Sequence, residues 1–326
     1  MSNMNLAAIL SPIKAEIAQL NANFMQQLHH DNLPIDSILS YISSHKGKQL
    51  RPAMVFLSAA INGEINQQTH TAALVLELLH TSSLIHDDIV DNGQKRHNKP
   101  TINVLWNNKI AVLLGDYLLS ECMNLIAQSN NQRLLHTTAR IAQEMVSGEL
   151  LQLAHLQQNI LSKEQYIKVV QQKTASLIAA CFEMGAISAK AEEEKVQQWK
   201  SFGQEVGIIF QIKDDLFDYQ KETSFEKDSY KDILEHKISL PFILALEQKS
   251  SPEREKWFQL YKNHSGTEEE IQAIIAMVTE NKGIAQSELF LEEKTQQVLQ
   301  FMDRQIDSEY KQSLIALVHY VKERSC

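Results

Sequence analysis

Apolar residues recur along most of the chain at spacings of three and four residues, which is the pattern of amphipathic helices. Near the N-terminus, Ile13, Ile17, Leu20 and Phe24 form one such stripe. The same periodicity predicts helices over the ranges 35–44, 51–62, 67–91, 102–128, 131–157, 163–190, 194–220, 239–249, 267–281, 284–305 and 309–323, with Pro252 opening a further one. Two polar stretches, 92–100 and 221–236, have no clean period and are predicted to be loops.

Composition supports a helical fold. The 326 residues include only 10 glycines and 6 prolines, far fewer than average usage gives. Because few turn-forming residues mean long elements with few connections, a β-sandwich, a propeller and a Rossmann sheet are all disfavoured. We find no internal repeat and no low-complexity linker. The sequence therefore predicts an all-α fold of roughly a dozen helices in a single domain over residues 1–326.

Charge and cysteine content exclude some partners and indicate a compartment. The formal net charge of −9 argues against nonspecific nucleic-acid binding, which needs a basic surface. Cys122, Cys181 and Cys326 lie far apart and offer neither a paired framework nor zinc-site spacing, so we expect reduced thiols in a cytoplasmic chain. Residues 1–10 lack the features of a signal peptide. No apolar run approaches the roughly 18 residues of a membrane-spanning helix, so no transmembrane segment is expected.

The pattern D-D-x-x-D occurs twice, each time at the C-terminal end of a long apolar-periodic helix. The two copies are Asp87, Asp88 and Asp91, and Asp214, Asp215 and Asp218. In each, the first and last aspartates are four residues apart and share a helix face, where like charges repel. They also lie near the negative end of the helix dipole, which disfavours acids. Both clusters break local rules, as functional sites often do.

A hard divalent cation relieves this conflict. Mg²⁺ prefers oxygen ligands and commonly bridges a few carboxylates to substrate phosphates. Two clusters facing each other across a cavity would hold several Mg²⁺ ions around one diphosphate. A single D-D-x-x-D is more often a solvated acidic face. That explanation weakens for two copies, since each follows a strongly apolar helix.

A diphosphate site in an acidic protein also needs cations at fixed points. Lys48 and Arg51 lie at a predicted helix entry, where Arg grips phosphate bidentately and the helix N-terminus offers free N–H groups. His80 lies seven residues before Asp87, on about the same helix face. A hydrogen-bonded core histidine explains His80 equally well. Further basic residues follow the first cluster or could surround the second: Lys95, Arg96, His97, Lys99, Lys173, Lys227 and Lys237.

In their order and spacing, several motifs resemble those of one family, the all-α trans-prenyltransferases or isoprenyl diphosphate synthases. The motifs are Gly47–Pro52, Glu77–Thr81, His86–Asp91, Gly115–Leu119, Gly148–Gln152, Lys173–Ala175, Phe210–Tyr219 and Lys237–Pro241. The chain is most similar to bacterial long-chain polyprenyl diphosphate synthases, from Ile13 to Arg324. This resemblance implies the isoprenoid synthase fold around a central cavity, and head-to-tail joining of isopentenyl diphosphate to an allylic diphosphate.

The resemblance also implies roles for individual residues. Asp87, Asp91 and Asp214 would bind Mg²⁺ ions, about three per active site, that hold the allylic diphosphate. The remaining aspartates of the clusters, Asp88, Asp215 and Asp218, would support them as catalytic residues. Contacts to the same diphosphate would come from Arg96, Lys173, Thr174, Gln211, Lys227 and Lys237, of which Lys173 and Lys237 are counted as catalytic. Isopentenyl diphosphate would be bound by Lys48, Arg51, His80 and His97. The departing diphosphate is the expected proton acceptor, so no protein base is named.

Two loops depart from the family pattern. The family usually has Arg-Arg-Gly where this chain has Arg96-His97-Asn98. A histidine is mostly neutral at pH 7, so we predict weaker isopentenyl diphosphate binding that improves at mildly acid pH. In the 221–236 stretch, the usual glycines are replaced by Glu226, Tyr230 and His236, which questions the closed conformation of that loop. These changes leave room for a slow or specialised enzyme.

Product length is the least constrained property. By resemblance, Ser82 and Ser83 line the product pocket where short-chain synthases place bulky aromatics, which favours a long-chain product. The alternative is that both serines merely pack between helices. The floor of the pocket is expected from helices around 118–140.

Several alternatives stay open. One is a short-chain farnesyl or geranylgeranyl synthase. A class I terpene cyclase would not need Lys48, Arg51 and His80. A non-catalytic partner subunit of a heteromeric synthase is suggested by the two altered loops, and a helical scaffold with acidic surface clusters is the fourth. The resemblance implies a homodimer, and a long product implies loose membrane contact on its release.

Overall fold

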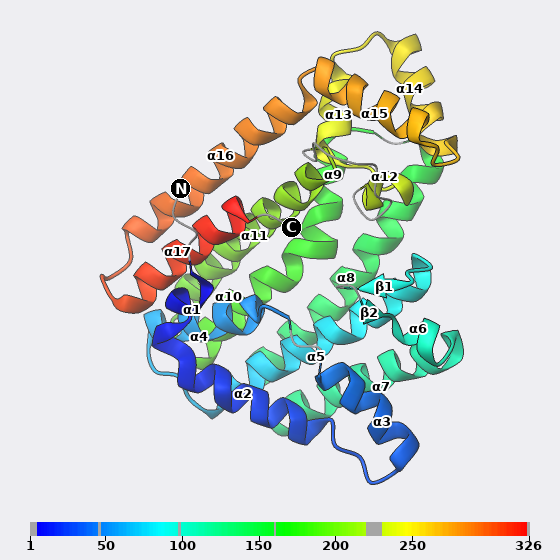
Figure 1. Ribbon diagram of the computed structural model, residues 1–326. Coiled ribbons are helices and arrows are strands. Elements are labelled where there is room, and N and C mark those ends of the chain that lie inside the picture. The colour runs from blue at the N-terminus through cyan, green and yellow to red at the C-terminus, as the bar shows by residue number, and fades with distance from the viewer. Residues whose placement is uncertain (1–4, 45–46, 97–98, 160, 220–229, 325–326) are drawn as a thin grey trace. The chain divides into compact units, whose positions relative to one another are not determined.

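The computed structural model describes residues 5–44, 47–96, 99–159, 161–219 and 230–324, and it is almost wholly helical (Figure 1). The chain forms two compact units, each assembled from three segments. The first comprises Met1–Ala142, Leu177–Gly203 and Gln305–Ala316, and the second comprises Gln143–Ser176, Gln204–Arg304 and Leu317–Cys326. The all-α class is confirmed, and the single domain over residues 1–326 stays a prediction.

The first unit consists of the N-terminal helices and a short hairpin. Its elements up to residue 142 are α1 (Leu6–Ile9), η1 (Ser11–Ile13), α2 (Lys14–Gln27), α3 (Leu33–Ser43), α4 (Leu50–Asn62), α5 (Gln67–Val90), β1 (Lys95–Arg96), β2 (Lys99–Pro100), α6 (Ile102–Leu105), α7 (Asn108–Gln128) and the first part of α8 (Gln132–Gln158). Most of α10 (Ser176–Ser188), the start of α11 (Glu193–Phe217) and part of α17 (Glu309–Glu323) complete it.

Helix α5 carries the first aspartate cluster at its C-terminal end. It begins at a capping box, in which the Asn66 side chain accepts from the backbone of Thr69 and the Thr69 hydroxyl accepts from the backbone of Asn66. The helix then packs along α7, where the Ser82 hydroxyl donates to the Gly115 carbonyl at 2.8 Å. A cap at one end and a neighbouring helix along its length thus fix where the cluster lies within this unit.

The second unit holds the other cluster. Its remaining elements are α9 (Lys163–Val170), the π-helical turn η2 (Gln171–Ala175), α12 (Lys231–Leu234), α13 (Leu240–Glu247), α14 (Ser251–Asn263), α15 (Glu268–Glu280) and α16 (Gly283–Asp303). Its core is a cluster of large side chains from α13, α14 and α15, including Phe242, Phe258, Tyr261, Ile271 and Met277. Burial of this cluster fixes α13, whose first residue, Leu240, takes part in the candidate site.

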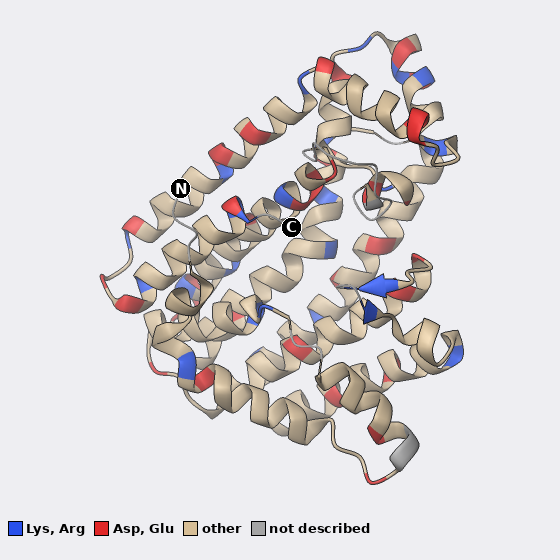
Figure 2. Cartoon of the chain, in the orientation of Figure 1, with Lys and Arg blue, Asp and Glu red and all other residues tan. Residues whose placement is uncertain are grey.

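Most predicted helices agree with the structure to within a few residues, but four stretches differ. One is the predicted loop 221–236, in which Lys231–Leu234 form α12. The predicted helix 102–128 is broken into α6 and α7, because Asn107 adopts a positive φ of 124° and its side chain caps α7. The predicted helix 163–190 is interrupted by η2. Part of the predicted loop 92–100 forms the antiparallel pair β1–β2, whose basic residues follow α5 (Figure 2).

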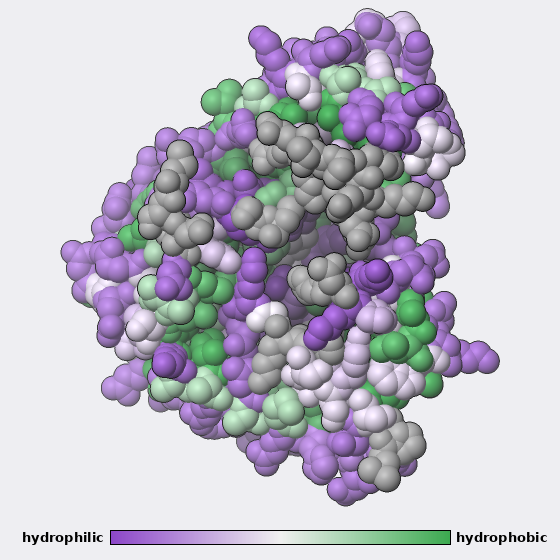
Figure 3. All heavy atoms as spheres, in the orientation of Figure 1, coloured by the Kyte–Doolittle hydropathy of each residue, from purple (hydrophilic) through white to green (hydrophobic). Residues whose placement is uncertain are grey.

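Helix α7 has an unusual apolar character. Among the described residues it is the one helix long and apolar enough to cross a membrane by length and composition, which differs from the expectation that no apolar run approaches that length. Leu114, Leu118 and Cys122 on this helix are buried. Val112 and Leu113 are exposed, and hydrophobic atoms also gather over the neighbouring α6 (Figure 3).

Candidate active site

The first aspartate cluster lies in the last turn of α5, and its three carboxylates differ in burial. Asp87 and Asp91 are half-buried, whereas Asp88 is only 8% exposed. Asp87 and Asp91 stand one helical turn apart, since the backbone N–H of Asp91 donates to the carbonyl of Asp87 at 2.8 Å. The cluster therefore presents two carboxylates on one face and turns the third inward.

Asp88 is bonded by Arg96 of the β1 strand. The Arg96 Nη2 donates to Oδ1 at 2.8 Å and its Nε donates to the same oxygen at 3.1 Å. Charge-assisted pairs of this kind are strong and directional. Asp88 thus anchors the hairpin that follows the cluster, and Arg96 is held beside it.

Three basic residues predicted to meet diphosphates are brought together in the first unit. His80 lies within electrostatic range of Arg51 and Arg96, and burial together with these two cations holds its pKa well below the usual value. Glu77, one turn before His80, has its pKa raised by burial and lowered by Arg51. Sequence reasoning quoted Glu77 as part of a motif but gave it no role. Its position indicates that a carboxylate offsets the charge of Arg51.

The second cluster is at the end of α11, and its first member pairs with the end of the chain. Asp214 accepts from Arg324 Nη2 at 2.5 Å, and its side chain is 33% exposed. The Arg324 guanidinium also lies over the Phe210 ring, 3.7 Å from its centroid. Sequence reasoning missed Arg324, because nothing in its local pattern indicates a contact with a residue so distant in the chain.

Asp215 faces the interior of the second unit. Its Oδ2 accepts from the Tyr166 hydroxyl and from the backbone N–H of Leu240, both at 2.7 Å, and its Oδ1 accepts from Gln211 Nε2 at 2.9 Å. Burial raises its pKa to about 7, against the lowering effect of these donors. The carboxylate is engaged by three protein donors, so its observed role is to join α9 and the start of α13 to α11.

Asp218 acts in a similar way on another element. Its Oδ2 accepts from the backbone N–H groups of Asp232 and Ile233, at 2.7 and 3.3 Å, in the first turn of α12. Burial and the nearby Asp232 raise its pKa to about 8. Asp218 therefore anchors the segment that follows the cluster.

Four of the basic and polar residues predicted around the second cluster lie among the described residues, and each is paired within the second unit. Lys173 forms an ion pair with Glu149 and donates to Gln152 at 3.4 Å. Lys237 pairs with Glu235 at 2.6 Å. The Thr174 hydroxyl donates to Gln211 Oε1 at 2.8 Å. Two residues assigned to the diphosphate, Thr174 and Gln211, are thus directly joined.

The altered loop at 221–236 is partly described. His236 adopts a left-handed φ of 55°, a conformation that favours glycine, which fits the expectation that glycine is usual there. Its Nδ1–H donates to the Tyr261 carbonyl at 2.9 Å, and its ring lies 4.3 Å from that of His264. Tyr230 is buried in the core of the unit. The predicted residues Lys227 and His97, together with Glu226 and Asn98, lie outside the described residues.

The two serines assigned to product length differ in environment. Ser82 is 2% exposed, and its hydroxyl donates a hydrogen bond to the Gly115 carbonyl. Ser83 is half-buried and donates to the carbonyl of His80 within its own helix. Ser82 is therefore bonded to α7, whereas the Ser83 hydroxyl is bonded within its own turn of α5.

Mg²⁺ fits the chemistry of the half-buried carboxylates. Asp87 and Asp91 offer oxygen ligands from one helix face, and Asp214 offers another from α11. Within the part of the chain that the structure describes, no group of three or more His, Cys, Asp or Glu is arranged to hold a metal ion by itself. Mg²⁺ does not require such a cage, since it is usually bound by one or two carboxylates plus substrate phosphates.

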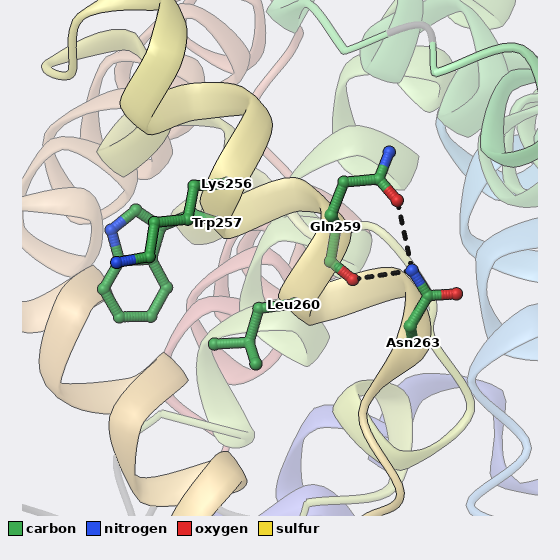
Figure 4. A pocket seen from close by; sticks show the side chains of 5 residues that line it. All are labelled: Lys256, Trp257, Gln259, Leu260 and Asn263. Atoms are coloured by element: carbon green, nitrogen blue, oxygen red, sulfur yellow. Dashed lines mark hydrogen bonds between the residues drawn. The ribbon is translucent and has the colours of Figure 1, made fainter.

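A surface hollow beside α14 is unrelated to these residues. It is lined by Lys256, Trp257, Gln259, Leu260 and Asn263, all from this helix (Figure 4). Gln259 and Asn263 bond to each other across one turn. The hollow contains no residue of either aspartate cluster, so it does not identify the site.

Comparison with known proteins decides the family. The sequence profile of the polyprenyl synthetases matches residues 33–278, a stretch that includes both aspartate clusters. The chain belongs to the polyprenyl synthetase family. The expected membership of the trans-prenyltransferases is thereby confirmed.

Individual members of the family match the chain from end to end. An octaprenyl diphosphate synthase of Haemophilus influenzae is 28% identical over 323 residues, which cover 99% of this chain and 98% of the relative. A nonaprenyl diphosphate synthase of Mycobacterium tuberculosis is 30% identical over 321 residues, covering 98% of this chain and 95% of the relative. Relatives with these names are prenyltransferases that make long-chain products.

Solved structures of the family confirm the fold. A polyprenyl synthase of Caulobacter crescentus, complexed with calcium and isoprenyl diphosphate, is 25% identical with a TM-score of 0.90 and covers 99% of each chain. A geranylgeranyl pyrophosphate synthase of Bacteroides thetaiotaomicron is 32% identical with a TM-score of 0.84, covering 98% of this chain and 99% of the other. The expected isoprenoid synthase fold is therefore confirmed.

Proposed function

We propose that this member of the family is a Mg²⁺-dependent enzyme that joins isopentenyl diphosphate head-to-tail to an allylic diphosphate and releases a long trans-polyprenyl diphosphate. The observation that carries the proposal is the end-to-end match to octaprenyl and nonaprenyl diphosphate synthases. Both aspartate clusters and the basic residues Arg51, His80 and Arg96 are present in the matched region.

In this proposal Asp87, Asp91 and Asp214 bind the Mg²⁺ ions that hold the allylic diphosphate. Support comes from burial, because these three carboxylates are half-buried while the other three aspartates are buried. A family member solved with calcium and isoprenyl diphosphate supports a divalent metal. About three ions per site is the number we propose. When bound, Mg²⁺ supplies positive charge that stabilises the diphosphate as it leaves.

The protein itself supplies fixed cations and a dry environment. Arg96, Lys173 and Lys237 contact the allylic diphosphate, and fixed positive charge favours the negative charge that develops as the C–O bond breaks. Thr174, Gln211 and Lys227 complete this set. Lys48, Arg51, His80 and His97 hold isopentenyl diphosphate. Apolar surroundings keep water from the allylic carbon, and the departing diphosphate accepts the proton.

We propose a long product on the basis of the small side chains on α5. Ser83 is the better candidate for lining the pocket, because the Ser82 hydroxyl is bonded to α7. We expect Ser83→Phe to shorten the longest product, whereas Ser82→Phe should chiefly cost stability. Sizing the extracted products of both variants tests this, and an unchanged length in Ser83→Phe would discard the proposed role. A geranylgeranyl synthase among the structural relatives keeps a short product as the competing result.

We also propose a homodimer in the cytoplasm that touches the membrane only loosely when it releases product. The uncovered apolar side chains Val112 and Leu113 on α7 support a partner surface of this kind. Light scattering of the purified chain gives the mass directly. A monomer that elongates nothing would favour the alternative of a partner subunit in a heteromeric synthase.

The proposed reaction is tested by one incubation. Purified protein is mixed with Mg²⁺, radiolabelled isopentenyl diphosphate and farnesyl diphosphate, and the extracted radioactivity is compared with that of the Asp87→Asn variant and of a sample with chelator. Incorporation that needs both Mg²⁺ and Asp87 is expected. Folded protein that incorporates no label with farnesyl, geranyl or geranylgeranyl diphosphate would contradict the proposal.

A further inference from the structure

A chain of hydrogen bonds in the second unit links three elements to α11. The Thr174 hydroxyl donates to Gln211 Oε1 at 2.8 Å, and Gln211 Nε2 donates to Asp215 Oδ1 at 2.9 Å. The other oxygen of Asp215 accepts from the Tyr166 hydroxyl and the Leu240 backbone N–H, both at 2.7 Å. Tyr166 and Asp215 are buried, at 7% and 3% exposure. This series of hydrogen bonds thus runs from η2 to the interior of the unit.

This arrangement decides which end of the Gln211 amide faces a ligand. In its ionised form the Asp215 carboxylate only accepts hydrogen bonds, so the –NH₂ end of Gln211 then faces Asp215 and its oxygen faces Thr174. Among the described residues, no acceptor is bonded to the second N–H of Gln211. That hydrogen is suited to a phosphate oxygen, which is an acceptor. Holding the carboxylate of Asp215 in one orientation therefore holds the amide of Gln211.

The π-turn explains how one helical segment reaches both ends of this series of hydrogen bonds. Tyr166 on α9 and Thr174 in η2 are eight residues apart. Over an uninterrupted α-helix this is a rotation of about 800°, which would point the two side chains about 80° apart. A π-turn takes up one extra residue, so the rotation becomes about 700°, within about 20° of two full turns. Both side chains therefore share the face that meets α11.

Close backbone packing fixes the same face. A Cβ on Gly207 of α11 would lie only 2.5 Å from the Cα of Ala175, so the two backbones are in direct contact there. Gly207, Gln211 and Asp215 are each four residues apart and form one face of α11. They are met in turn by Ala175, Thr174 and Tyr166. The two segments form a seam with three successive contacts.

We propose that Tyr166 is a positioning residue for diphosphate binding: its hydroxyl orients the Asp215 carboxylate, which orients the Gln211 amide toward the allylic diphosphate. The inference rests on the proposed function, which assigns Gln211 to that diphosphate. Tyr166 touches neither substrate nor metal in this role. The π-turn is the feature of the fold that lets Tyr166 and Thr174 act on the same amide.

A double-mutant cycle with Tyr166→Phe, Gln211→Ala and both together tests the proposal. Tyr166→Phe should raise the KM for the allylic diphosphate about three- to tenfold, and leave the KM for isopentenyl diphosphate within about twofold. Because Tyr166 acts through Gln211, the double variant should have the allylic KM of Gln211→Ala alone. Additive effects would overturn the proposal, and so would an unchanged allylic KM in Tyr166→Phe.

Tyr219→Phe is the matched control for a merely structural loss. The Tyr219 hydroxyl is also buried in the second unit and bonds to Ser239 Oγ at 2.8 Å. Its removal should lower the melting temperature about as much as Tyr166→Phe does, and leave the allylic KM within about twofold. An equal rise of the allylic KM in both variants would show a general effect of lost stability and would contradict the positioning role.

A binding measurement separates this inference from the proposed function. Thermal unfolding with Mg²⁺ and increasing inorganic diphosphate gives a midpoint concentration for each variant without any turnover. The same non-additivity between Tyr166 and Gln211 is expected in these midpoints. Wild-type protein that elongates nothing would overturn the proposed reaction, whereas additive midpoints would overturn the positioning role of Tyr166.

Discussion

The two aspartate clusters share one sequence pattern but have different surroundings. In the first, the buried carboxylate of Asp88 is bonded by the guanidinium of Arg96. In the second, Asp215 and Asp218 are bonded by uncharged donors, and burial raises their pKa values to about 7 and about 8. The last aspartates also differ, since Asp91 is half-buried and Asp218 is buried.

The two clusters show that the D-D-x-x-D pattern alone does not assign a role to each carboxylate. Within each cluster, buried members hold neighbouring structure: Asp88 holds the β1 strand, and Asp215 and Asp218 hold the first turns of α13 and α12. The half-buried members, Asp87, Asp91 and Asp214, are the ones that we propose as metal ligands. The structure thus separates buried carboxylates that hold neighbouring elements from half-buried carboxylates.

The largest expected effect comes from removing a half-buried carboxylate. Asp87→Asn and Asp214→Asn should each lower kcat/KM about a thousandfold, because metal and diphosphate binding lose a charged ligand. Asp215→Asn should cost about tenfold, because its partners are protein donors. Steady-state kinetics at saturating Mg²⁺ measure all three. Equal losses in Asp214→Asn and Asp215→Asn would remove the distinction between the two kinds of carboxylate.

The next effect is on the free energy of unfolding when the cation of an ion pair is removed. Arg96→Gln leaves the buried Asp88 carboxylate without its cation and should lower the free energy of unfolding by about 1–3 kcal/mol. Arg324→Gln should cost less than about 1 kcal/mol, because Asp214 is more exposed. Urea unfolding measures both. A larger loss in Arg324→Gln than in Arg96→Gln would contradict the burial argument.

The raised pKa of Asp218 predicts that the stability of the fold depends on pH. A carboxyl group whose folded pKa lies above its unfolded value stabilises the fold at low pH, and this contribution is lost as pH rises through the folded pKa, here about 8. In Mg²⁺-free buffer, Asp218→Asn should therefore gain melting temperature relative to wild type, by a few degrees, between pH 5 and pH 8.5. The exposed control Asp303→Asn should show no such trend, and a constant difference for Asp218→Asn would refute the shift.

The smallest effect concerns the altered loop after the first cluster. His97→Arg should lower the KM for isopentenyl diphosphate several-fold at pH 8 and little at pH 6, because a protonated histidine already carries the charge that arginine would bring. Kinetics at both pH values measure this. A wild-type KM that is constant from pH 6 to 8, together with no effect of the substitution, would contradict the predicted role of charge at position 97.

Much of the fold could be predicted from the sequence because its signals are local. The apolar stripe of α2, Pro52 near the start of α4 and Gly63 at its end each act within a turn or two of helix. The two clusters could be found because two carboxylates one turn apart repel each other whatever the tertiary structure. Local rules therefore sufficed for most of the helices and for locating the two clusters, whereas the assignment of Asp87, Asp91 and Asp214 to metal came from the family resemblance.

The remainder depends on contacts between distant residues. The π-turn takes up only one extra residue, and this shift is too small to be recognised in the spacing of apolar residues. The sequence therefore predicts one helix over 163–190. The bonds from Tyr166 to Asp215 and from Arg324 to Asp214 join residues 49 and 110 positions apart. Periodicity carries no information about such pairs. For the same reason, sequence could not show which aspartates in a cluster are buried.

The most direct test of this account is thermal unfolding of the wild-type chain with Mg²⁺ alone, inorganic diphosphate alone, and both together. A ligand that binds only the folded state raises the melting temperature. We predict a rise of several degrees only when both are present, and its loss in Asp87→Asn and Asp214→Asn but not in Asp303→Asn. An equal rise with diphosphate alone, or the same rise in all three variants, would contradict the claim that the half-buried carboxylates hold the metal and its diphosphate.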